Sequence, residues 1–188
     1  MITAFVNFLI RKGALDKEYQ ETSVYGLTLL VEKVVTYLLL SGLALFMGKL
    51  AEGLVFAVCF VCLRQATGGF HAKTFLGCLA GSAVSFFIAV EVLAAWLDRC
   101  PLAVAVLLVL SIFCVVVWAP VNHPNLLLTE EEMKKNRLWS RMILFIETVT
   151  VMLGYFLHRQ WQQYIVSAVI LCAVFILIAK IMRQEVKI

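Results

Sequence analysis

Six runs of apolar residues follow one another along this chain, and they limit what it can fold into. They cover residues 27–47, 50–64, 75–97, 102–119, 142–157 and 164–182. An α-helix needs about 20 apolar residues to cross the hydrocarbon core of a bilayer. Because 63% of the chain is hydrophobic and only 15% is charged, the pattern excludes a soluble domain. It predicts an all-α membrane protein with six transmembrane helices.

The first residues, MITAFVNFLIRKGALDKEYQ, form a shorter apolar run followed by Arg11, Lys12 and Lys17. No basic stretch precedes the run and no small-residue cleavage site follows it, so a cleaved signal peptide is not expected. Residues 1–22 are instead predicted to form an amphipathic helix at the inner membrane surface. Without repeats or linkers, residues 1–188 are expected to form a single domain.

The distribution of Lys and Arg predicts the orientation, because cytoplasmic loops carry the excess of positive charge. With all six runs spanning and a cytoplasmic amino terminus, the inner side holds twelve such residues and the outer side only three, Lys49, Arg99 and Arg159. Run 50–64 is short for a spanning helix. If it were a re-entrant segment, only five Lys and Arg residues would lie inside and ten would lie outside, so a spanning segment is favoured. Both termini and the loops 64–74 and 120–141 are therefore predicted to be cytoplasmic. The short run then requires either that Arg64 snorkels toward the inner headgroups or that the bilayer thins locally.

The stretch RQATGGFHAKTFLGC, residues 64–78, lies at the predicted cytoplasmic ends of the second and third runs. Gly68 and Gly69 permit a turn and the close approach of another segment. Thr74 is a good N-cap for the third helix. The stretch is therefore expected to be a turn followed by a capped helix start.

Two chemically reactive side chains lie within this stretch, Cys78 and His71. Cys78 is expected at the end of the first helical turn, where the positive end of the helix dipole and a nearby cation, Arg64 or Lys73, favour negative charge. His71 is the nearby side chain suited to act as a general base. The pair has the composition of a nucleophile and its activator.

One geometric condition applies to this pair. In a straight helix, His71 and Cys78 would be about 10 Å apart along the axis. The chain is therefore predicted to bend just before Thr74, which folds His71 back over the helix end. Because cysteine is often buried and interfacial histidine is often a polar anchor, the residues alone leave open a functional pair and simple interfacial filler.

The arginine, the glycine pair, the histidine and the cysteine of RQATGGFHAKTFLGC resemble the signature of the accessory gene regulator B family. The stretch APVNHPNLLLTEEEMKKNR resembles that family's proline-rich cytoplasmic segment and the acidic, lysine-bearing stretch after it. Members are membrane endopeptidases of Gram-positive bacteria that process a small precursor into a cyclic quorum-sensing peptide. The resemblance implies that Cys78 is the nucleophile and His71 its base, and that Arg64 and Gly69 are also needed.

The resemblance further implies a precursor with an amphipathic amino-terminal segment and a charged carboxyl-terminal tail. Cys78 would form a thioester with it, and an internal cysteine or serine of the precursor would then close a thiolactone or lactone. The first amides of the third helix or Gln65 are candidates to stabilise the oxyanion. Gly68, with Arg64 and Gly69, is a further candidate for catalytic support. The active site would face the cytoplasm of a homodimer in the cell membrane, with no cofactor, metal or nucleic acid.

Two carboxylates, Glu147 and Glu32, are candidates to orient His71 or to contact substrate, since charged groups inside a membrane are costly. Pairing of Glu32 with Lys33, or of Glu147 with Arg141, is the alternative explanation.

Basic residues are the candidates to bind the precursor's tail. They are Lys73 in the first loop and Lys134 and Lys135 in the second. The stretch TEEEMKKNR is predicted to be a short helix capped by Thr129, and its lysines could also bind anionic lipid.

Two other classes of function stay open. One is a membrane thiol oxidoreductase using Cys59 and Cys62, although both are predicted toward the inner end of their span, away from the oxidising side. The other is a small transporter, whose path the intramembrane charges would line: Glu32, Lys33, Glu91 and Glu147. The remaining cysteines are expected to be apolar filler, and the three histidines have no zinc spacing.

Overall fold

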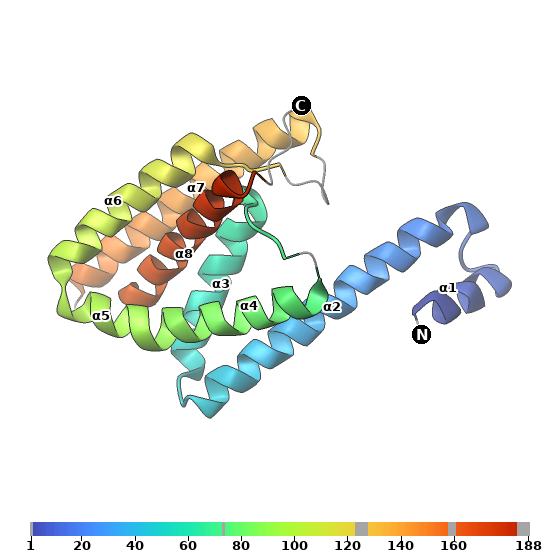
Figure 1. Ribbon diagram of the computed structural model, residues 1–188, viewed down its shortest axis with the longest axis horizontal. Coiled ribbons are helices and arrows are strands. Elements are labelled where there is room, and N and C mark those ends of the chain that lie inside the picture. Colours follow the sequence, from blue (N-terminus) through green and yellow to red (C-terminus); the bar gives the residue numbers. More distant parts are fainter. Residues whose placement is uncertain (1, 73, 123–127, 158–160, 184–188) are drawn as a thin grey trace.

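The computed structural model describes residues 2–72, 74–122, 128–157 and 161–183 (Figure 1). Over these residues the chain is built from helices, six of which are long and apolar enough to cross a membrane. They are formed by α2 (Gln20–Phe46), α3 (Leu50–Thr67), the continuous segment of α4 (Phe75–Phe87), η2 (Ile88–Leu93) and α5 (Ala94–Arg99), α6 (Pro101–Trp118), α7 (Glu130–Phe156) and α8 (Gln162–Ile181). The prediction of six spanning helices is confirmed. The side of the membrane on which the termini lie stays a prediction.

Several boundaries differ from the predicted ones. The second span continues through Arg64 to Thr67, so its 18 residues cover about 27 Å and the predicted shortfall in length largely disappears. The stretch TEEEMKKNR is not a separate short helix, because α7 runs without a break from Glu130 to Phe156. The third span contains the π-helical segment η2, a wider turn that the apolar pattern did not indicate.

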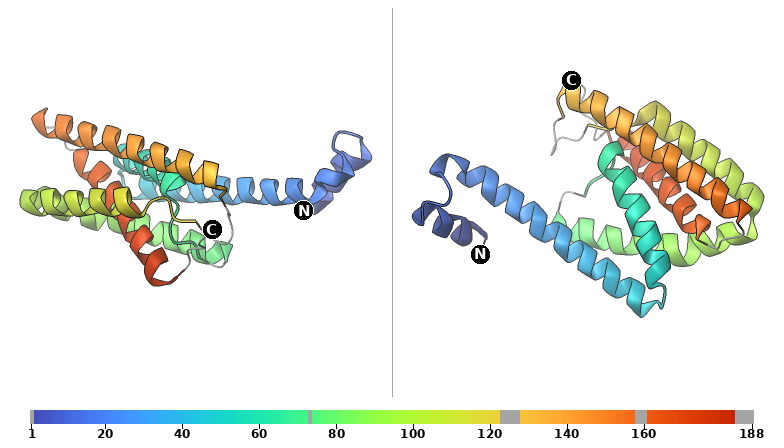
Figure 2. Two further views of the ribbon diagram at one scale, coloured as in Figure 1. Left: turned by 90° about the horizontal axis from the view of Figure 1, so that it is seen from above. Right: turned by 180° about the vertical axis from the view of Figure 1, so that it is seen from behind.

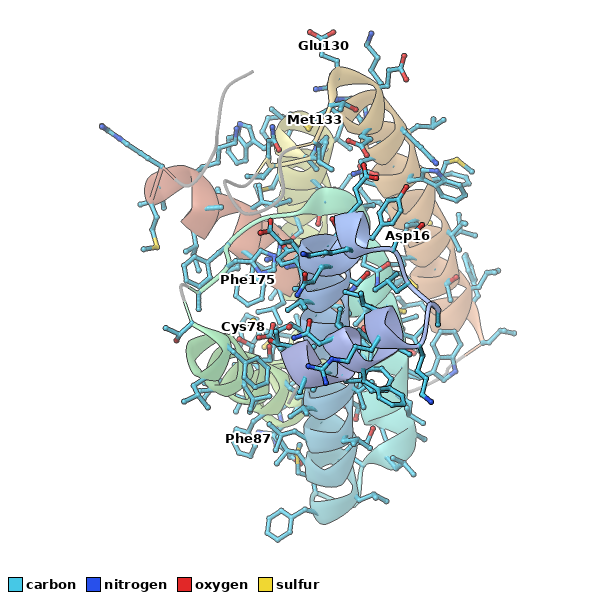
Figure 3. The ribbon with its side chains drawn as sticks, turned by 90° about the vertical axis from the view of Figure 1, so that its right-hand side faces the viewer. Asp16, Cys78, Phe87, Glu130, Met133 and Phe175 are labelled. Atoms are coloured by element: carbon cyan, nitrogen blue, oxygen red, sulfur yellow. The ribbon has the colours of Figure 1, made fainter. Side chains whose placement is uncertain are left out.

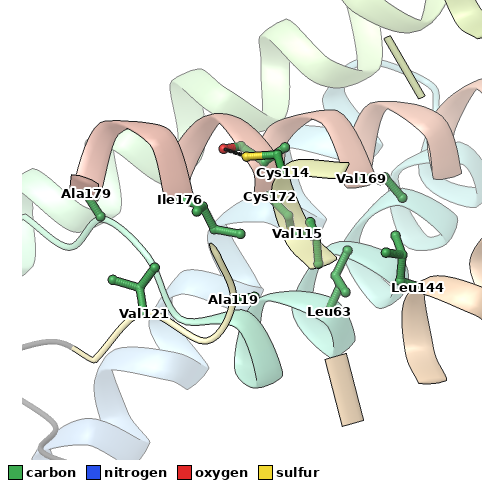
Figure 4. Packing of buried hydrophobic residues seen from close by; sticks show 11 residues of the cluster. Leu63, Cys114, Val115, Ala119, Val121, Leu144, Val169, Cys172, Ile176 and Ala179 are labelled. Carbon is green, nitrogen blue, oxygen red and sulfur yellow. Dashed lines mark hydrogen bonds between the residues drawn. The ribbon is translucent and has the colours of Figure 1, made fainter. Parts of the chain in front are cut away.

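Helix α8 is the centre of the bundle. Twelve of its 20 residues are buried, and it packs against α3, α6, α7, α5 and η2. Figure 4 shows one of the clusters it organises, in which Cys172 and Ile176 meet Leu63 of α3 and Val115 of α6. Because α8 is held on several sides, groups attached to it have a rigid support.

Helices α1 (Ile2–Arg11) and α2 contrast with this core. Only Ala44 of α2 is buried, near the end that adjoins α3. In Figures 1 and 2, α1 and the first half of α2 stand away from the other helices. The helix predicted for residues 1–22 is shorter than expected, because α1 ends at Arg11 and residues from Gln20 onward belong to the long α2. Helix α1 has apolar residues over most of its length and Arg11 in its last turn.

One end of the bundle gathers the segments singled out by the sequence. The end of α3 is bonded to the segment after α6 through Val121 N–H and Thr67 C=O. The loop before α4 is bonded to the last turns of α8 through Phe70 N–H and Phe175 C=O. The predicted loops 64–74 and 120–141 therefore begin side by side.

Candidate functional site

The candidate site begins with a glycine pair that ends α3. Gly68 is the C-cap, with φ +65°, and its N–H donates to the carbonyl of Arg64 at 3.0 Å. A Cβ atom at Gly68 would lie 2.5 Å from the backbone oxygen of Val121. Both the positive φ and the close approach require glycine here. The predicted turn is confirmed, and its neighbour is the segment that follows α6.

Val121 and Asn122 form the other side of this contact. Val121 pairs with Gly68 in a parallel bridge, and its N–H donates to Thr67 C=O at 2.9 Å. Asn122 is 1% exposed, and its Oδ1 accepts from Leu128 N–H at 2.9 Å. Leu128, just before α7, is thereby bonded to Asn122, and the adjacent Val121 is bonded to the end of α3.

Arg64 turns toward this loop, while its reach to the inner headgroups stays a prediction. Its Nη2 donates to the carbonyl of Phe70, and its guanidinium lies over the ring of Phe175 on α8, 5.3 Å from the ring centroid. A Cβ atom on Gly69, whose φ is +115°, would lie 2.5 Å from Nη1 of Arg64. The arginine therefore folds over the loop, and a glycine at position 69 leaves it the space.

Thr74 caps α4 as predicted. Its backbone is extended, and its Oγ1 accepts from Gly77 N–H at 3.2 Å. Cys78 N–H donates to Thr74 C=O, which makes it the first amide of α4 with an intrahelical partner. Cys78 is half-buried in the first turn (Figure 3), as predicted. The amides of Phe75 and Leu76 lie in the first turn of α4, where N–H groups have no carbonyl acceptor within the helix.

The bend predicted just before Thr74 falls at residue 73, which lies outside the described residues, but α3 ends at Thr67 and α4 begins at Phe75, so His71 and Cys78 do not share one straight helix. The chain before the bend folds back over the helix start, since a Cβ atom on Gly77 would lie 3.3 Å from the Cβ of Ala72. His71 precedes Ala72 directly and is exposed. The approach of its ring to Cys78 stays a prediction.

The Arg64 guanidinium lies close enough to the thiols of Cys78 and Cys172 to interact with both electrostatically. This agrees with the expectation that a cation lies near Cys78. The other predicted cation, Lys73, lies outside the described residues.

The remaining candidates lie in different surroundings. Glu147 is 5% exposed on α7, and neither of its oxygens has a hydrogen-bond partner in the described part of the chain. Its carboxylate lies within electrostatic range of the thiols of Cys59 on α3 and Cys172 on α8. The alternative pairing with Arg141 is therefore not formed, and the Arg141 side chain donates to the Val116 carbonyl at 3.4 Å.

Glu32 is half-buried in the middle of α2, and Gln65 is exposed on α3. Lys134 and Lys135 are exposed in the second turn of α7. Glu91, a candidate for a transport path, forms an ion pair with Lys49 at 2.8 Å between the carboxylate Oε2 and the ammonium Nζ. Both paired residues lie at the end of the bundle away from Cys78, so this pair is separate from the site.

All six cysteines are free thiols, with Cys62 exposed and Cys114 and Cys172 buried. An apolar cavity of about 340 Å³ lies between α2 and α3 and is lined in part by Tyr37, Phe56 and Cys62. It does not include His71 or Cys78. Within the described ranges, no group of three or more His, Cys, Asp or Glu is placed to hold a metal ion.

Sequence reasoning missed Phe70, Val121 and Phe175. Phe175 carried no signal, because it is one apolar residue in an apolar helix. Val121 had a weak one, since it follows Pro120 in a stretch rich in turn formers, but the pattern does not say which segment such a turn contacts.

The chain was compared with known families, proteins and structures. The family model described as accessory gene regulator B matches residues 2–181. Searches of curated proteins and of solved structures give no match.

Proposed function

This chain belongs to the accessory gene regulator B family, and from that premise we propose that it is a membrane cysteine endopeptidase, with Cys78 as nucleophile and His71 as base. Family membership makes it a multi-pass membrane protein that takes part in processing the precursor of a quorum-sensing peptide. The peptidase chemistry and the residues that perform it are the proposal.

One observation carries the proposal. The loop that bears His71 is fixed at both ends, by the Val121 contact at Gly68 and by the Thr74 cap at α4, and it leads directly into the turn that holds Cys78. A nucleophile needs a base within hydrogen-bond reach, often looser before substrate binds. A loop folded back over the helix start can supply that base.

The reaction follows from these groups. Cys78 Sγ, its proton taken by His71, attacks the carbonyl carbon of a precursor peptide bond. The C–N bond breaks, the tail leaves as an amine that takes the proton from His71, and a thioester remains on Cys78. An internal cysteine or serine of the precursor then attacks the thioester carbonyl. The ring closes as a thiolactone or lactone, and Cys78 is released as a thiol.

Charge on the reacting oxygen has candidate partners at the start of α4. The Phe75 and Leu76 amides lack intrahelical acceptors, and N–H groups of this kind stabilise an oxyanion. Gln65 is a further candidate, since its side chain is exposed on the last turn of α3.

We place the active site at the cytoplasmic face of the cell membrane of a Gram-positive bacterium, because the Lys and Arg distribution predicts that side. The exposed Lys134 and Lys135 would bind the charged tail of the precursor there. A homodimer is part of the same family-based proposal.

The test is co-expression with the precursor peptide, followed by mass spectrometry of the membrane fraction. The wild type should yield the cleaved, cyclised product, and Cys78→Ala and His71→Ala should yield none at equal protein level. The matched control is Cys62→Ala, which removes the exposed thiol of α3 and should leave the product unchanged. Undiminished product from Cys78→Ala would overturn the proposal.

A further inference from the structure

We propose that Phe175 on α8 is a positioning residue of the active site, which holds Arg64 and the His71-bearing loop against the most buried helix of the bundle. The inference rests on the proposed function and adds a residue to it. Phe175 is far from the loop in sequence and belongs to neither of the stretches that drew attention to the site.

The backbone of Phe175 supplies the first contact. Its carbonyl oxygen accepts from Phe70 N–H at 3.0 Å. The same oxygen would lie 3.1 Å from a Cβ atom on Gly69. The loop therefore lies directly against α8 over Gly69 and Phe70, just before His71.

The ring of Phe175 supplies the second contact. It lies 5.3 Å from the Arg64 guanidinium, within the range of a cation–π interaction. It stacks on the ring of Phe70 with centroids 6.5 Å apart and meets Phe60 edge-on at 5.9 Å. One ring thus contacts both the arginine and the loop.

A closed set of interactions results. Phe175 C=O accepts from Phe70 N–H, Phe70 C=O accepts from Arg64 Nη2, and the Arg64 guanidinium covers the Phe175 ring. Arg64 Nη1 is buried and has no hydrogen-bond partner among the described residues. It packs against Gly69, where a Cβ atom would lie 2.5 Å from it, so the loop encloses the guanidinium.

This arrangement has a kinetic consequence. Arg64 folds over the loop that carries His71, and that loop leads into the turn that holds Cys78, so a ring that contacts both Arg64 and the loop affects how well the reacting groups are aligned. Misalignment by about 1 Å can lower the rate about 100-fold. Loss of the ring should therefore lower kcat more than it raises KM.

The experiment compares Phe175→Leu, which removes the ring, with Phe175→Tyr, which keeps it. The control is Phe113→Leu, which removes an exposed ring on α6 whose partner is Trp118. For each purified protein in liposomes, kcat and KM are measured on the precursor, and amide hydrogen exchange is measured over residues 68–72. Phe70→Leu, which changes a partly buried loop residue, gives a second way to break the stack without altering α8.

We expect Phe175→Leu to lower kcat roughly 10- to 100-fold, with KM within about 3-fold and faster exchange in the loop. Phe175→Tyr and Phe113→Leu should stay within about 3-fold of wild type in both parameters, since the ring contact is kept or was never part of the site. Phe70→Leu should reproduce the loss in kcat.

Wild-type kcat and loop exchange in Phe175→Leu would overturn the inference, and so would wild-type kcat in Phe70→Leu. That failure is distinguishable from failure of the proposed function, because Cys78→Ala is assayed in parallel. If Cys78→Ala is inactive while the Phe175 and Phe70 variants are normal, the peptidase proposal stands and the positioning role does not.

Discussion

Val121 donates its N–H to the carbonyl of Thr67 at 2.9 Å, and this bond joins the two sequence segments that define the site. Thr67 is the last residue of α3, and Val121 lies between α6 and α7. Through this contact, the residues before α7 support the turn that leads to His71. Substitutions at position 121 or 68 should therefore lower the activity by displacing the turn that leads to His71.

Gly68→Ala tests this connection. The new Cβ atom would lie 2.5 Å from Val121 O, a backbone atom that a side-chain movement cannot displace, and φ is +65°. We expect loss of most precursor processing, by roughly 10-fold or more, because the loop must shift. Processing is measured by mass spectrometry of the cyclised product.

The control for that variant is Gly81→Ala on α4, where nothing lies within 4 Å of the new Cβ atom and the backbone is helical. It should process the precursor at the wild-type rate. Equal activity of Gly68→Ala and Gly81→Ala would show that the contact with Val121 does not support the site.

Glu147→Gln tests whether the buried carboxylate of α7 orients His71 or takes no part in the reaction. Both oxygens lack partners within the residues that the structure describes, and an unpaired buried charge is costly, so the neutral isostere should keep full activity and unfold at an equal or higher temperature. The measurement is precursor turnover together with thermal unfolding in detergent. A selective loss of turnover at unchanged stability would instead support a role in orienting His71.

The sequence predicted the spans well because each depends on local composition alone. The same holds for Thr74 and Thr129, whose capping is decided within three residues. The partners of Arg64 were not predicted, because Phe70 and Phe175 come from a loop and from a distant helix. Apolar periodicity carries no information about which helices become neighbours.

Glu147 illustrates the same limit. Its approximate depth follows from its position in the fifth run, but the identity of its neighbours depends on how α7 is rotated against α3 and α8. The structure gives it Cys59 and Cys172 as electrostatic neighbours. A charged residue in a span therefore indicates that its surroundings are functionally or structurally special, but the sequence does not show which residues surround it.

Thr129→Ala should weaken the start of α7. Thr129 Oγ1 accepts from Glu132 N–H, while Glu132 Oε2 accepts from Thr129 N–H at 2.8 Å, which forms a capping box. Loss of the hydroxyl should cost about 1 kcal/mol, or about 2–4 °C in Tm. Thr129→Ser keeps the acceptor and should restore the Tm, as measured by thermal unfolding; equal Tm values for all three proteins would contradict the role of the cap.

The ion pair at the other end of the bundle gives a prediction with a definite pH dependence. The hydrogen bond from Lys49 to Glu91, assisted by their charge attraction, raises the pKa of Lys49 above its usual 10.5, although partial burial opposes this. A group with a raised folded-state pKa stabilises the fold fully below its unfolded pKa and loses that effect as pH rises through the folded value. The pair should therefore contribute at neutral pH and stop contributing in strong alkali.

Lys49→Met should lower the free energy of unfolding at pH 7 by about 0.5–1 kcal/mol, because the paired side chains are still 30% and 29% exposed. Lys49→Glu should be worse, since it places two carboxylates together, and Lys49→Glu with Glu91→Lys should recover much of the loss. Arg99→Met, an exposed cation in the last turn of α5, is the control and should have little effect. Thermal unfolding at pH 7 and at pH values above the raised pKa measures these differences. A deficit in Lys49→Met that persists undiminished in alkali would mean that its methylene packing, rather than its charge, stabilises this end of the bundle.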